Sequence, residues 1–206
     1  MHENARLYLL LTRGLCLGSP TRTLQAALDG GVDLVQVREK PFGATGQQWI
    51  DTVCKICARH DVPVIVNDRL DLAARTAAAG AHLGQADLTP HARGSLRARD
   101  WVLGVSTHDA AELGRALEEA PDYVGVGPCF GTPTRPDLRG QGAERIATLA
   151  TASPVPCFAI GGITQETLPE LLAAGIRRVA VSAAILRASD PGRAARDLCR
   201  ALDACS

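Results

Sequence analysis

The feature that most constrains the fold is a regular alternation of short apolar runs with longer, helix-like segments. The apolar runs are almost continuous, as in "LYLLL" and "VIVN", which is typical of parallel strands buried on both faces. Strands are expected at residues 7–11, 34–38, 64–67, 81–84, 102–106, 123–127, 157–160 and 179–182. Helices are expected at residues 21–30, 44–59, 69–79, 91–99, 108–119, 141–151, 165–174 and 191–204.

Eight such strand-then-helix units predict an α/β fold of the closed (β/α)8 TIM-barrel type. The 206 residues leave about 26 residues for each unit, which is the compact end of the range for this fold. An open, doubly wound sheet is the alternative, but "LTRGLCLGSP" after the first strand lacks the GxGxxG fingerprint of that class. No linker interrupts the pattern, so residues 1–206 are expected to form a single TIM-barrel domain.

Charge and hydropathy exclude several classes of partner. The 22 Lys and Arg residues balance 22 Asp and Glu residues, whereas a nucleic-acid-binding protein would carry a basic stripe. No membrane partner is expected, because no apolar run approaches the roughly 20 residues that a span requires. The run at residues 7–11 is closed by Arg13 and is too short for a signal peptide, so a cytoplasmic location is expected.

The cysteines indicate a reducing environment. There are seven of them, scattered along the chain, which fits free thiols better than a disulfide framework. "CKIC" at residues 54–57 resembles a redox or zinc pair, but it lies in a helical pattern without a second CxxC. A structural role is therefore expected for Cys54 and Cys57.

Polar residues follow the second strand, where a barrel places its active site. In "QVREK", Gln36 and Arg38 are two positions apart and so share one face of the strand. An amide and a cation turned into a barrel require a polar or anionic partner. Arg38 and Lys40 have the donors that phosphate oxygens accept, although Lys40 and Glu39 also fit a solvated loop.

Acidic residues follow the next two strands. "VNDR" supplies Asn67 and Asp68, and "HLGQADL" supplies Gln85 and Asp87. Because these strands are neighbours, both carboxylates are expected at the same part of the rim, where Mg²⁺ could bridge them to a diphosphate. The alternative is that Asp68 and Asp87 cap the helices that follow.

Ser106 ends the fifth strand, and two histidines lie nearby. "GVSTH" is not a nucleophile elbow, so Ser106 is expected to form a hydrogen bond with a ligand rather than to attack it. His82 lies within a strand and fits either a packed or a catalytic side chain. His108 is expected at the start of a helix, and the scattered histidines do not predict a zinc site.

Three further loops complete the rim. The sixth strand runs into "GPCFGTPTRPD", which fits either a surface turn or a binding loop for an anionic ligand. The last two strands end in "AIGGIT" and "VAVSAAIL". Gly161 and Gly162 allow a close backbone approach, and a short helix after the eighth strand suits a phosphate monoester; tight turns alone are the alternative.

Taken together, these segments resemble the thiamine-phosphate synthase family. The matching stretches are "VQVREK", "VIVNDRLDLA", "GAHLGQADL", "LGVSTH", "YVGVGPCFGTPTRPD", "AIGGI" and "VAVSAAI", which span nearly all of the barrel units. The resemblance implies a (β/α)8 barrel that joins a hydroxymethylpyrimidine diphosphate to a thiazole phosphate with Mg²⁺. The products would be thiamine phosphate and diphosphate.

The resemblance also assigns roles to residues. Pyrimidine diphosphate would contact Gln36, Val37, Arg38, Glu39, Lys40, Asn67, Ser106 and Arg135. Thiazole phosphate would contact Thr132, Pro133, Thr134, Gly162, Ser182 and Ala183. Asp68 and Asp87 would hold Mg²⁺, and the catalytic residues would be Arg38, Lys40, Ser106 and Arg135.

The chain departs from the family pattern in the rim loops. The family usually has Lys at Arg135, usually has Pro at Gly131 and often has Ser at Ala183, whereas here the hydroxyl is at Ser182. The competing identities are a thiazole tautomerase-like relative, which carries His where Pro128 stands, and a non-catalytic protein that binds thiamine precursors. Family analogy also permits a homodimer.

Overall fold

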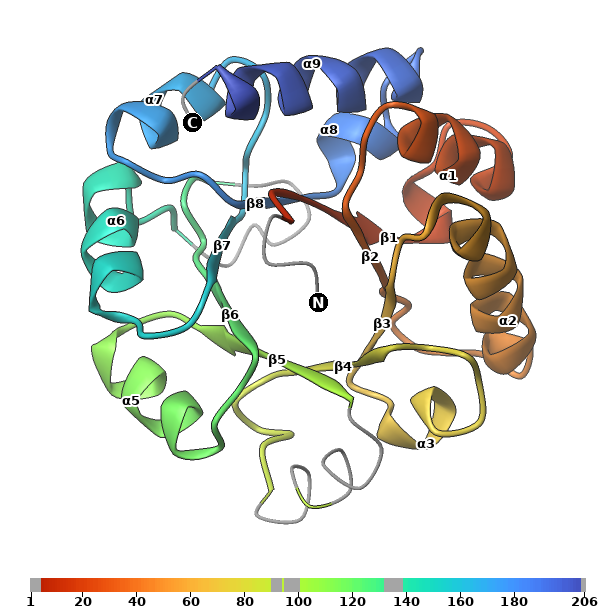
Figure 1. The fold of residues 1–206 in the computed structure, drawn as a ribbon, viewed down its shortest axis with the longest axis horizontal. Coiled ribbons are helices and arrows are strands. Elements are labelled where there is room, and N and C mark those ends of the chain that lie inside the picture. The colour runs from red at the N-terminus through yellow and green to blue at the C-terminus, as the bar shows by residue number, and fades with distance from the viewer. Residues whose placement is uncertain (1–4, 90–93, 95–100, 132–138, 205–206) are drawn as a thin grey trace.

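The computed structural model describes residues 5–89, 94, 101–131 and 139–204. Eight parallel strands close into a barrel in chain order, and β8 pairs with β1 to complete the ring (Figure 1). The strands are β1 Leu7–Leu11, β2 Leu34–Val37, β3 Val64–Asn67, β4 Gly80–Leu83, β5 Val102–Thr107, β6 Tyr123–Val126, β7 Cys157–Ile160 and β8 Val179–Val181. The predicted (β/α)8 fold is confirmed, and each predicted strand ends within one residue of its observed bounds.

The helices surround the strands as an outer ring (Figure 1). They are α1 Pro20–Asp29, α2 Gly46–Cys57, α3 Leu70–Ala73, α5 Ala110–Glu118, α6 Ala143–Ala152, α7 Leu168–Ala173, α8 Ala183–Leu186 and α9 Pro191–Asp203. Two 3₁₀ turns, η1 Arg13–Leu15 and η2 Ala58–His60, follow β1 and α2. The helix predicted at residues 91–99 lies, apart from position 94, outside the described residues.

The helix predicted at residues 69–79 is wrong in length. α3 ends at Ala73, and the chain then tightens into turns in which Arg75 N–H bonds Leu72 O and Thr76 N–H bonds Ala73 O. The Thr76 hydroxyl also donates to both of these carbonyls, at 3.1 and 3.2 Å. A hydroxyl that competes for helix carbonyls favours a helix end, and the alanine-rich sequence concealed this stop.

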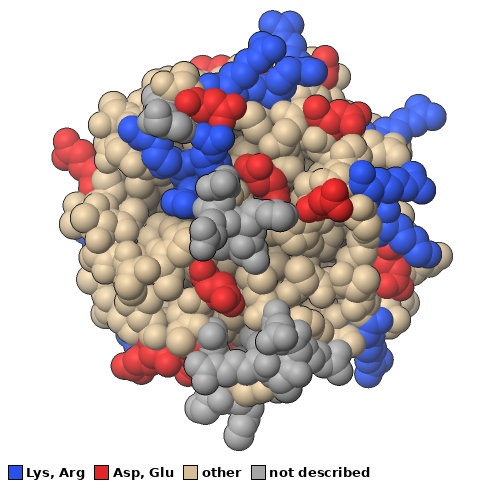
Figure 2. Space-filling model, in the orientation of Figure 1, with Lys and Arg blue, Asp and Glu red and all other residues tan. Residues whose placement is uncertain are grey.

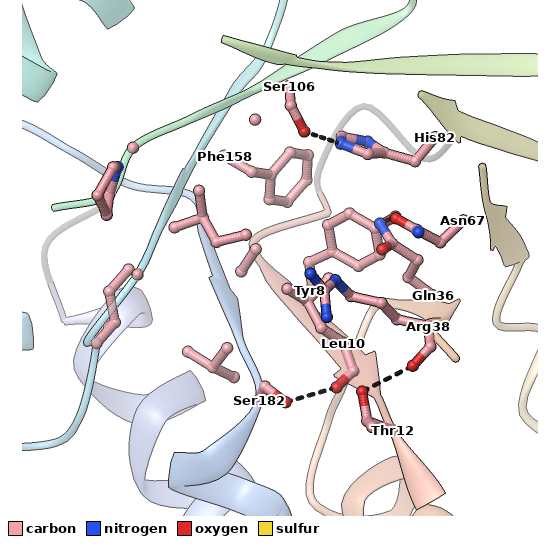
Figure 3. A pocket seen from close by; sticks show the side chains of 18 of the residues that line it. Tyr8, Leu10, Thr12, Gln36, Arg38, Asn67, His82, Ser106, Phe158 and Ser182 are labelled. Atoms are coloured by element: carbon pink, nitrogen blue, oxygen red, sulfur yellow. Dashed lines mark hydrogen bonds between the residues drawn. The ribbon is translucent and has the colours of Figure 1, made fainter. Parts of the chain in front are cut away.

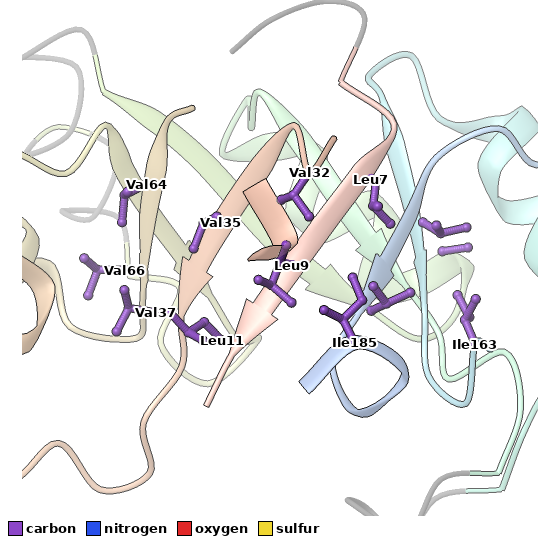
Figure 4. Packing of buried hydrophobic residues seen from close by; sticks show 14 of the residues in the cluster. Leu7, Leu9, Leu11, Val32, Val35, Val37, Val64, Val66, Ile163 and Ile185 are labelled. Carbon is purple, nitrogen blue, oxygen red and sulfur yellow. The ribbon is translucent and has the colours of Figure 1, made fainter. Parts of the chain in front are cut away.

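The larger apolar core lies between the barrel and its helices. Leu7, Leu9 and Leu11 of β1 point outward into it, as do Val35 and Val37 of β2 (Figure 4). All five side chains are fully buried, and burying a side chain of this size contributes about 1.5–3 kcal/mol. This outer layer fixes the barrel against its helices and leaves the other face of each strand for the interior.

A smaller core fills the barrel interior. Tyr8, Tyr123 and Phe158 are fully buried there, together with Leu34 and Ile65. Alternation along β1 therefore assigns Tyr8 and Leu10 to the inside and the odd-numbered leucines to the outside.

Among the described residues, no helix is long and apolar enough to cross a membrane. Basic and acidic side chains are interspersed on the face seen in Figure 2.

Candidate active site

A cavity of about 390 Å³ opens at the carboxyl ends of the strands. Its floor includes Tyr8 and Phe158, whose ring centroids lie 5.3 Å apart in an edge-to-face arrangement (Figure 3). Tyr123 packs edge-on against both rings, at 5.7 Å from Tyr8 and 5.5 Å from Phe158. The aromatic triangle closes the barrel interior below the cavity, and Tyr8 and Phe158 give the floor a largely apolar surface.

Polar side chains line one side of the cavity, along β2 to β5. Those predicted from the sequence that line it are Gln36, Arg38, Lys40, Asn67, Asp68, Asp87 and Ser106. The labelled members, Gln36, Arg38, Asn67 and Ser106, gather around one region in Figure 3. The barrel thus brings together residues that are up to 70 positions apart in the chain, from Gln36 to Ser106.

Val37 and Glu39 do not line the cavity with their side chains. Val37 is fully buried in the outer core, so any contact with a ligand would come from its backbone. Glu39 accepts hydrogen bonds from the backbone N–H and the Nε–H of Arg13, at 3.0 and 3.2 Å. Arg13 in turn lies over the Trp49 ring, with its Cζ 5.2 Å from the centroid. Glu39 therefore holds the β1 loop beside the rim.

Asp68 faces the cavity and does not cap a helix. Its carboxylate lies 2.9 Å from the Lys40 ammonium, while the N-cap position of α3 is Arg69. Its backbone N–H donates to His82 O at 2.9 Å, and its φ of +59° is a conformation that few non-glycine residues adopt. Two adjacent strands thus fix this carboxylate at the rim, where Asp87 also lines the cavity.

The acid pair fits a magnesium site in its chemistry. Mg²⁺ in proteins is bound by one or two carboxylates, with water and phosphate oxygens as the other ligands. Within the described residues, no group of three or more His, Cys, Asp or Glu side chains forms a metal cage. A carboxylate pair beside an open cavity suits a metal that shares its shell with a phosphorylated ligand, and Asp68 and Asp87 match this donor set.

Asn67 carries an unpartnered donor. Its side chain is 5% exposed and lines the cavity, and its Nδ2 group has no hydrogen-bond partner in the structure. Burying an amide without a partner costs about 1–3 kcal/mol. Such a cost is usually recovered from a ligand or an ordered water molecule, and this supports the predicted ligand contact.

His82 is buried and connects the floor to the rim. Its Nε2 atom lies 2.8 Å from Ser106 Oγ (Figure 3), and its Nδ1 atom lies 3.1 Å from the Tyr123 hydroxyl. The pKa of His82 is lowered to about 4, chiefly by burial; Asp68 partly opposes the shift, and the nearby Arg38 and Lys40 charges add to it. The side chain is therefore neutral near pH 7, and of the two readings left open by the sequence, it is a packed histidine that also reaches the cavity.

His108 and Gln85 hold the β5 end of the rim. His108 lies just before α5, as predicted, and its Nδ1 is 2.6 Å from the Glu112 carboxylate. Glu112 N–H donates to the Asp109 side chain, the N-cap of the helix. Gln85 Nε2 donates to Ser106 O at 2.8 Å, which fixes the backbone of Ser106 beside the cavity.

Backbone turns form the opposite side of the cavity, after β7 and β8. Gly161 and Gly162 have φ of +100° and +64°, and a Cβ at Gly162 would lie 2.6 Å from Gly131 O. The glycines thus let this turn pack against the β6 loop, where Phe130 N–H donates to Gly161 O. Both glycines make a tight turn, and both also line the cavity.

The β8 end supplies backbone donors. The Ser182 hydroxyl donates to Leu10 O at 2.9 Å (Figure 3), so its proton is already engaged with the neighbouring strand. α8 begins at the next residue, Ala183, and the first N–H groups of a helix have no partner within the helix. Ser182 and Ala183 line the cavity, so a ligand here would meet main-chain N–H groups.

The β6 loop is described only in part. Thr132, Pro133, Thr134 and Arg135 lie outside the described residues. Gly127, Pro128 and Gly131, which precede them, line the cavity.

None of the described cysteines lines the cavity. Cys54 and Cys57 are buried in α2, and burial raises their thiol pKa values to about 11 and about 12. A thiol that stays protonated at neutral pH is a poor nucleophile and metal ligand. The described cysteines, Cys16, Cys54, Cys57, Cys129, Cys157 and Cys199, are free.

Sequence reasoning missed the aromatic floor. Tyr8, Tyr123 and Phe158 occupy strands that read as apolar on both faces, and no motif marks them. Their one sequence signal is an aromatic residue on the inward-facing side of a strand that is otherwise mostly aliphatic. This signal can be interpreted only once the closed barrel brings the three rings together.

This closed barrel, with its polar rim at the carboxyl ends of the strands, places the chain among the TIM-barrel enzymes. The family model described as thiamine monophosphate synthase matches residues 7–185, and the chain belongs to this family. It is 42% identical to thiamine-phosphate synthase of Mycolicibacterium smegmatis, over 98% of this chain and 94% of that protein. It is 43% identical to the Thermobifida fusca protein of the same name, over 97% and 93%.

A solved structure agrees in fold. The thiamine phosphate pyrophosphorylase of Pyrococcus furiosus superimposes with a TM-score of 0.87 at 26% identity, covering 98% of this chain and 96% of that chain. The 3-hexulose-6-phosphate synthase barrel superimposes with a TM-score of 0.71 at 19% identity and supports the fold alone.

Proposed function

We propose that this chain is a thiamine-phosphate synthase. It would join 4-amino-2-methyl-5-(diphosphooxymethyl)pyrimidine to hydroxyethylthiazole phosphate, or to the carboxylated form, and release diphosphate. The observation that carries the proposal is one cavity with two unlike sides. One side has cationic, amide and carboxylate side chains, and the other has Gly161, Gly162 and the start of α8, with Ile163 and Thr164 beside them. Two substrates with different phosphate groups suit such a cavity.

The side-chain rim suits the diphosphate. Arg38 and Lys40 line the cavity and place positive charge where the leaving group gains negative charge. Asn67 Nδ2 is a buried donor without a partner, which a diphosphate or pyrimidine acceptor would satisfy. Arg135, which lies outside the described residues, is proposed to add a further cation.

The backbone rim suits the thiazole phosphate. N–H groups at Gly162, Ser182 and Ala183 would receive its phosphate oxygens, and Thr132, Pro133 and Thr134 are proposed to complete this subsite. The family often has its hydroxyl at position 183, whereas this chain has it at Ser182, where it already donates to Leu10 O. A phosphate bound by backbone N–H groups does not need this hydroxyl, so the shift removes no donor that it requires.

Asp68 and Asp87 are proposed to hold Mg²⁺. When bound, the ion would neutralise charge on the departing diphosphate. Lys40 lies against Asp68 and would balance the acidic charge of this corner. The acid pair is therefore proposed as part of the leaving-group site and not as a proton-transfer pair.

The proposed reaction is a dissociative substitution. The bond between the pyrimidine methylene carbon and the diphosphate oxygen breaks, and its electron pair departs with the oxygen. The thiazole nitrogen then donates its lone pair to form the new carbon–nitrogen bond. The chain's task is to stabilise the leaving charge and to hold the two reactants close, which is catalysis by positioning.

Turnover with both substrates, with and without Mg²⁺, tests this proposal. A synthase forms thiamine phosphate and diphosphate in a Mg²⁺-dependent reaction. A tautomerase-like relative would isomerise a thiazole without Mg²⁺ or the pyrimidine, and a binding protein would retain the precursors without product. Either of those results contradicts the proposal. A homodimer and a cytoplasmic location stay predictions.

A further inference from the structure

A continuous chain of hydrogen bonds crosses the barrel interior beneath the cavity. Gln36 Nε2 donates to the Tyr8 hydroxyl at 2.8 Å, and the Tyr8 and Tyr123 hydroxyls lie 2.8 Å apart. The Tyr123 hydroxyl is 3.1 Å from His82 Nδ1, and His82 Nε2 is 2.8 Å from Ser106 Oγ. Gln36, Tyr8, Tyr123 and His82 are buried, and Ser106 lies at the end of this hydrogen-bond series that faces the cavity.

The first contact gives this chain a direction. The Gln36 amide nitrogen can only donate, so the Tyr8 oxygen accepts and its proton remains available. Of the two described residues that hydrogen-bond to the Tyr8 hydroxyl, Tyr123 alone can accept, so the Tyr8 proton goes to Tyr123. Tyr123 then donates to His82 Nδ1, and the neutral imidazole donates from Nε2 to Ser106 Oγ. In this order each buried hydroxyl and the imidazole N–H of this network has an acceptor.

The reverse order leaves a buried proton unpaired. If Ser106 donated to His82 and Tyr123 donated to Tyr8, the Tyr8 oxygen would accept two bonds while its own proton had no described acceptor. An unmade hydrogen bond at a buried group costs about 1–3 kcal/mol. In the forward order, the unpaired proton is instead that of Ser106, which faces the cavity and can be donated to a ligand.

Gly104 makes room for the central contact. It lies between His82 and Tyr123 in the sheet, paired with His82 on β4 and with Tyr123 on β6. A Cβ at this position would lie 2.3 Å from the Tyr123 hydroxyl and 2.6 Å from His82 Nδ1. The missing side chain therefore allows the phenol and the imidazole to meet across an intervening strand.

We propose that Gln36, Tyr8, Tyr123 and His82 form a directional relay that holds His82 as its Nε2–H tautomer and makes Ser106 a hydrogen-bond donor to the substrate. Tyr123 is the positioning residue that acts on His82 directly; Tyr8, which accepts from Gln36, donates to the Tyr123 oxygen and reinforces this order. The substrate assignment rests on the proposed function: Ser106 would donate to an acceptor atom of the pyrimidine diphosphate. The tautomer assignment does not depend on it.

Nitrogen NMR of the protein labelled with ¹⁵N-histidine tests the relay without substrate, with the His82 signal assigned by its loss in His82→Gln. The expected spectrum shows an unprotonated Nδ1 and a protonated Nε2 for His82. Tyr123→Phe removes the donor to Nδ1 and is expected to give a mixture of tautomers. Tyr8→Phe keeps Tyr123 as donor and is expected to retain the wild-type tautomer. A protonated Nδ1 in the wild-type protein, or an unchanged tautomer in Tyr123→Phe, overturns the relay.

A double-mutant cycle tests the connection to Ser106. Tyr123→Phe is expected to lower kcat/KM about 10-fold in the wild-type background, the cost of about one hydrogen bond, and less than 2-fold in Ser106→Ala. Equal losses in both backgrounds would show that Tyr123 acts independently of Ser106 and would contradict the relay. If the wild-type protein forms no thiamine phosphate, the proposed function fails, while the NMR result still decides the tautomer. Gly104→Ala, which obstructs the Tyr123–His82 contact without removing a polar group, is expected to reproduce the tautomer mixture.

Discussion

The two sides of the cavity mouth are built by different means. The rim along β2 to β5 presents side chains, among them Arg38, Asn67 and Asp68, whereas the rim after β7 and β8 presents backbone around Gly162 and Ala183. A side-chain rim can be dismantled one functional group at a time. A backbone rim is insensitive to the loss of a hydroxyl or methyl group and is sensitive to any added Cβ that distorts the turn. The two sides should therefore respond to opposite kinds of mutation.

The largest effect is expected from removing a cation of the side-chain rim. Arg38→Ala should lower kcat/KM about 1,000-fold, because a preorganised charge at the leaving group is lost. Diphosphate release in steady-state assays measures this. Arg59→Ala, which removes an exposed arginine at η2, is the control and should be silent. A loss below about 5-fold in Arg38→Ala would contradict the role of this rim in leaving-group departure.

The second prediction concerns pH and the floor beneath the side-chain rim. The pKa of His82 is about 4 in the folded protein and 6.5 in a model peptide, so the unfolded chain binds this proton first as pH falls. The buried, neutral imidazole therefore contributes fully to the free energy of unfolding above about pH 6.5. This contribution is lost as the pH falls to about 4, which lowers the free energy of unfolding by about 3 kcal/mol in total. Urea unfolding at about pH 7 and about pH 4.5 should show a smaller loss for His82→Gln than for the wild-type protein. Parallel losses in the two proteins would refute the burial of a neutral imidazole.

The third prediction adds a methyl group to the backbone rim. Gly162→Ala should raise KM for the thiazole phosphate about 10-fold, because its φ is positive and the new Cβ meets the β6 loop. Gly175→Ala is a matched control, with φ of +90° but open space around the Cβ position. It should cost stability and leave KM unchanged. If both variants, or neither, raise KM, the turn after β7 is not the thiazole phosphate site.

The smallest effect is expected from removing a hydroxyl of the backbone rim. Ser182→Ala loses the bond to Leu10 O, worth about 1 kcal/mol of stability, and keeps the N–H groups. KM for the thiazole phosphate should change less than about 3-fold, since the hydroxyl is engaged elsewhere. Steady-state kinetics and a thermal melt measure the two effects. An increase in KM above 10-fold would indicate that the hydroxyl itself binds the phosphate.

The contrast between the rims also explains what the sequence could predict. Once a barrel is inferred, charged residues at strand ends predict a site from their type and position, as Arg38, Asp68 and Asp87 do. No such signal marks Tyr8, Tyr123 and Gly104. In the sequence, an interior tyrosine is indistinguishable from an ordinary apolar strand residue, and an interior glycine only weakens the prediction of a strand. Their relation depends on the register of three neighbouring strands and on contact across the barrel, which no local pattern encodes. The early end of α3 was hidden for a related reason, since a run of alanines favours a helix while the Thr76 hydroxyl bonds back to its carbonyls.

The division of labour between the two rims is tested most directly by calorimetric titration of two ligands into two variants. Asp68→Asn is expected to lose Mg²⁺-dependent binding of inorganic pyrophosphate and to retain binding of the thiazole phosphate. Gly162→Ala is expected to show the opposite pattern. If Asp68→Asn binds pyrophosphate with Mg²⁺ as the wild-type protein does, or if each variant loses both ligands, the two sides of the mouth do not hold separate phosphate groups.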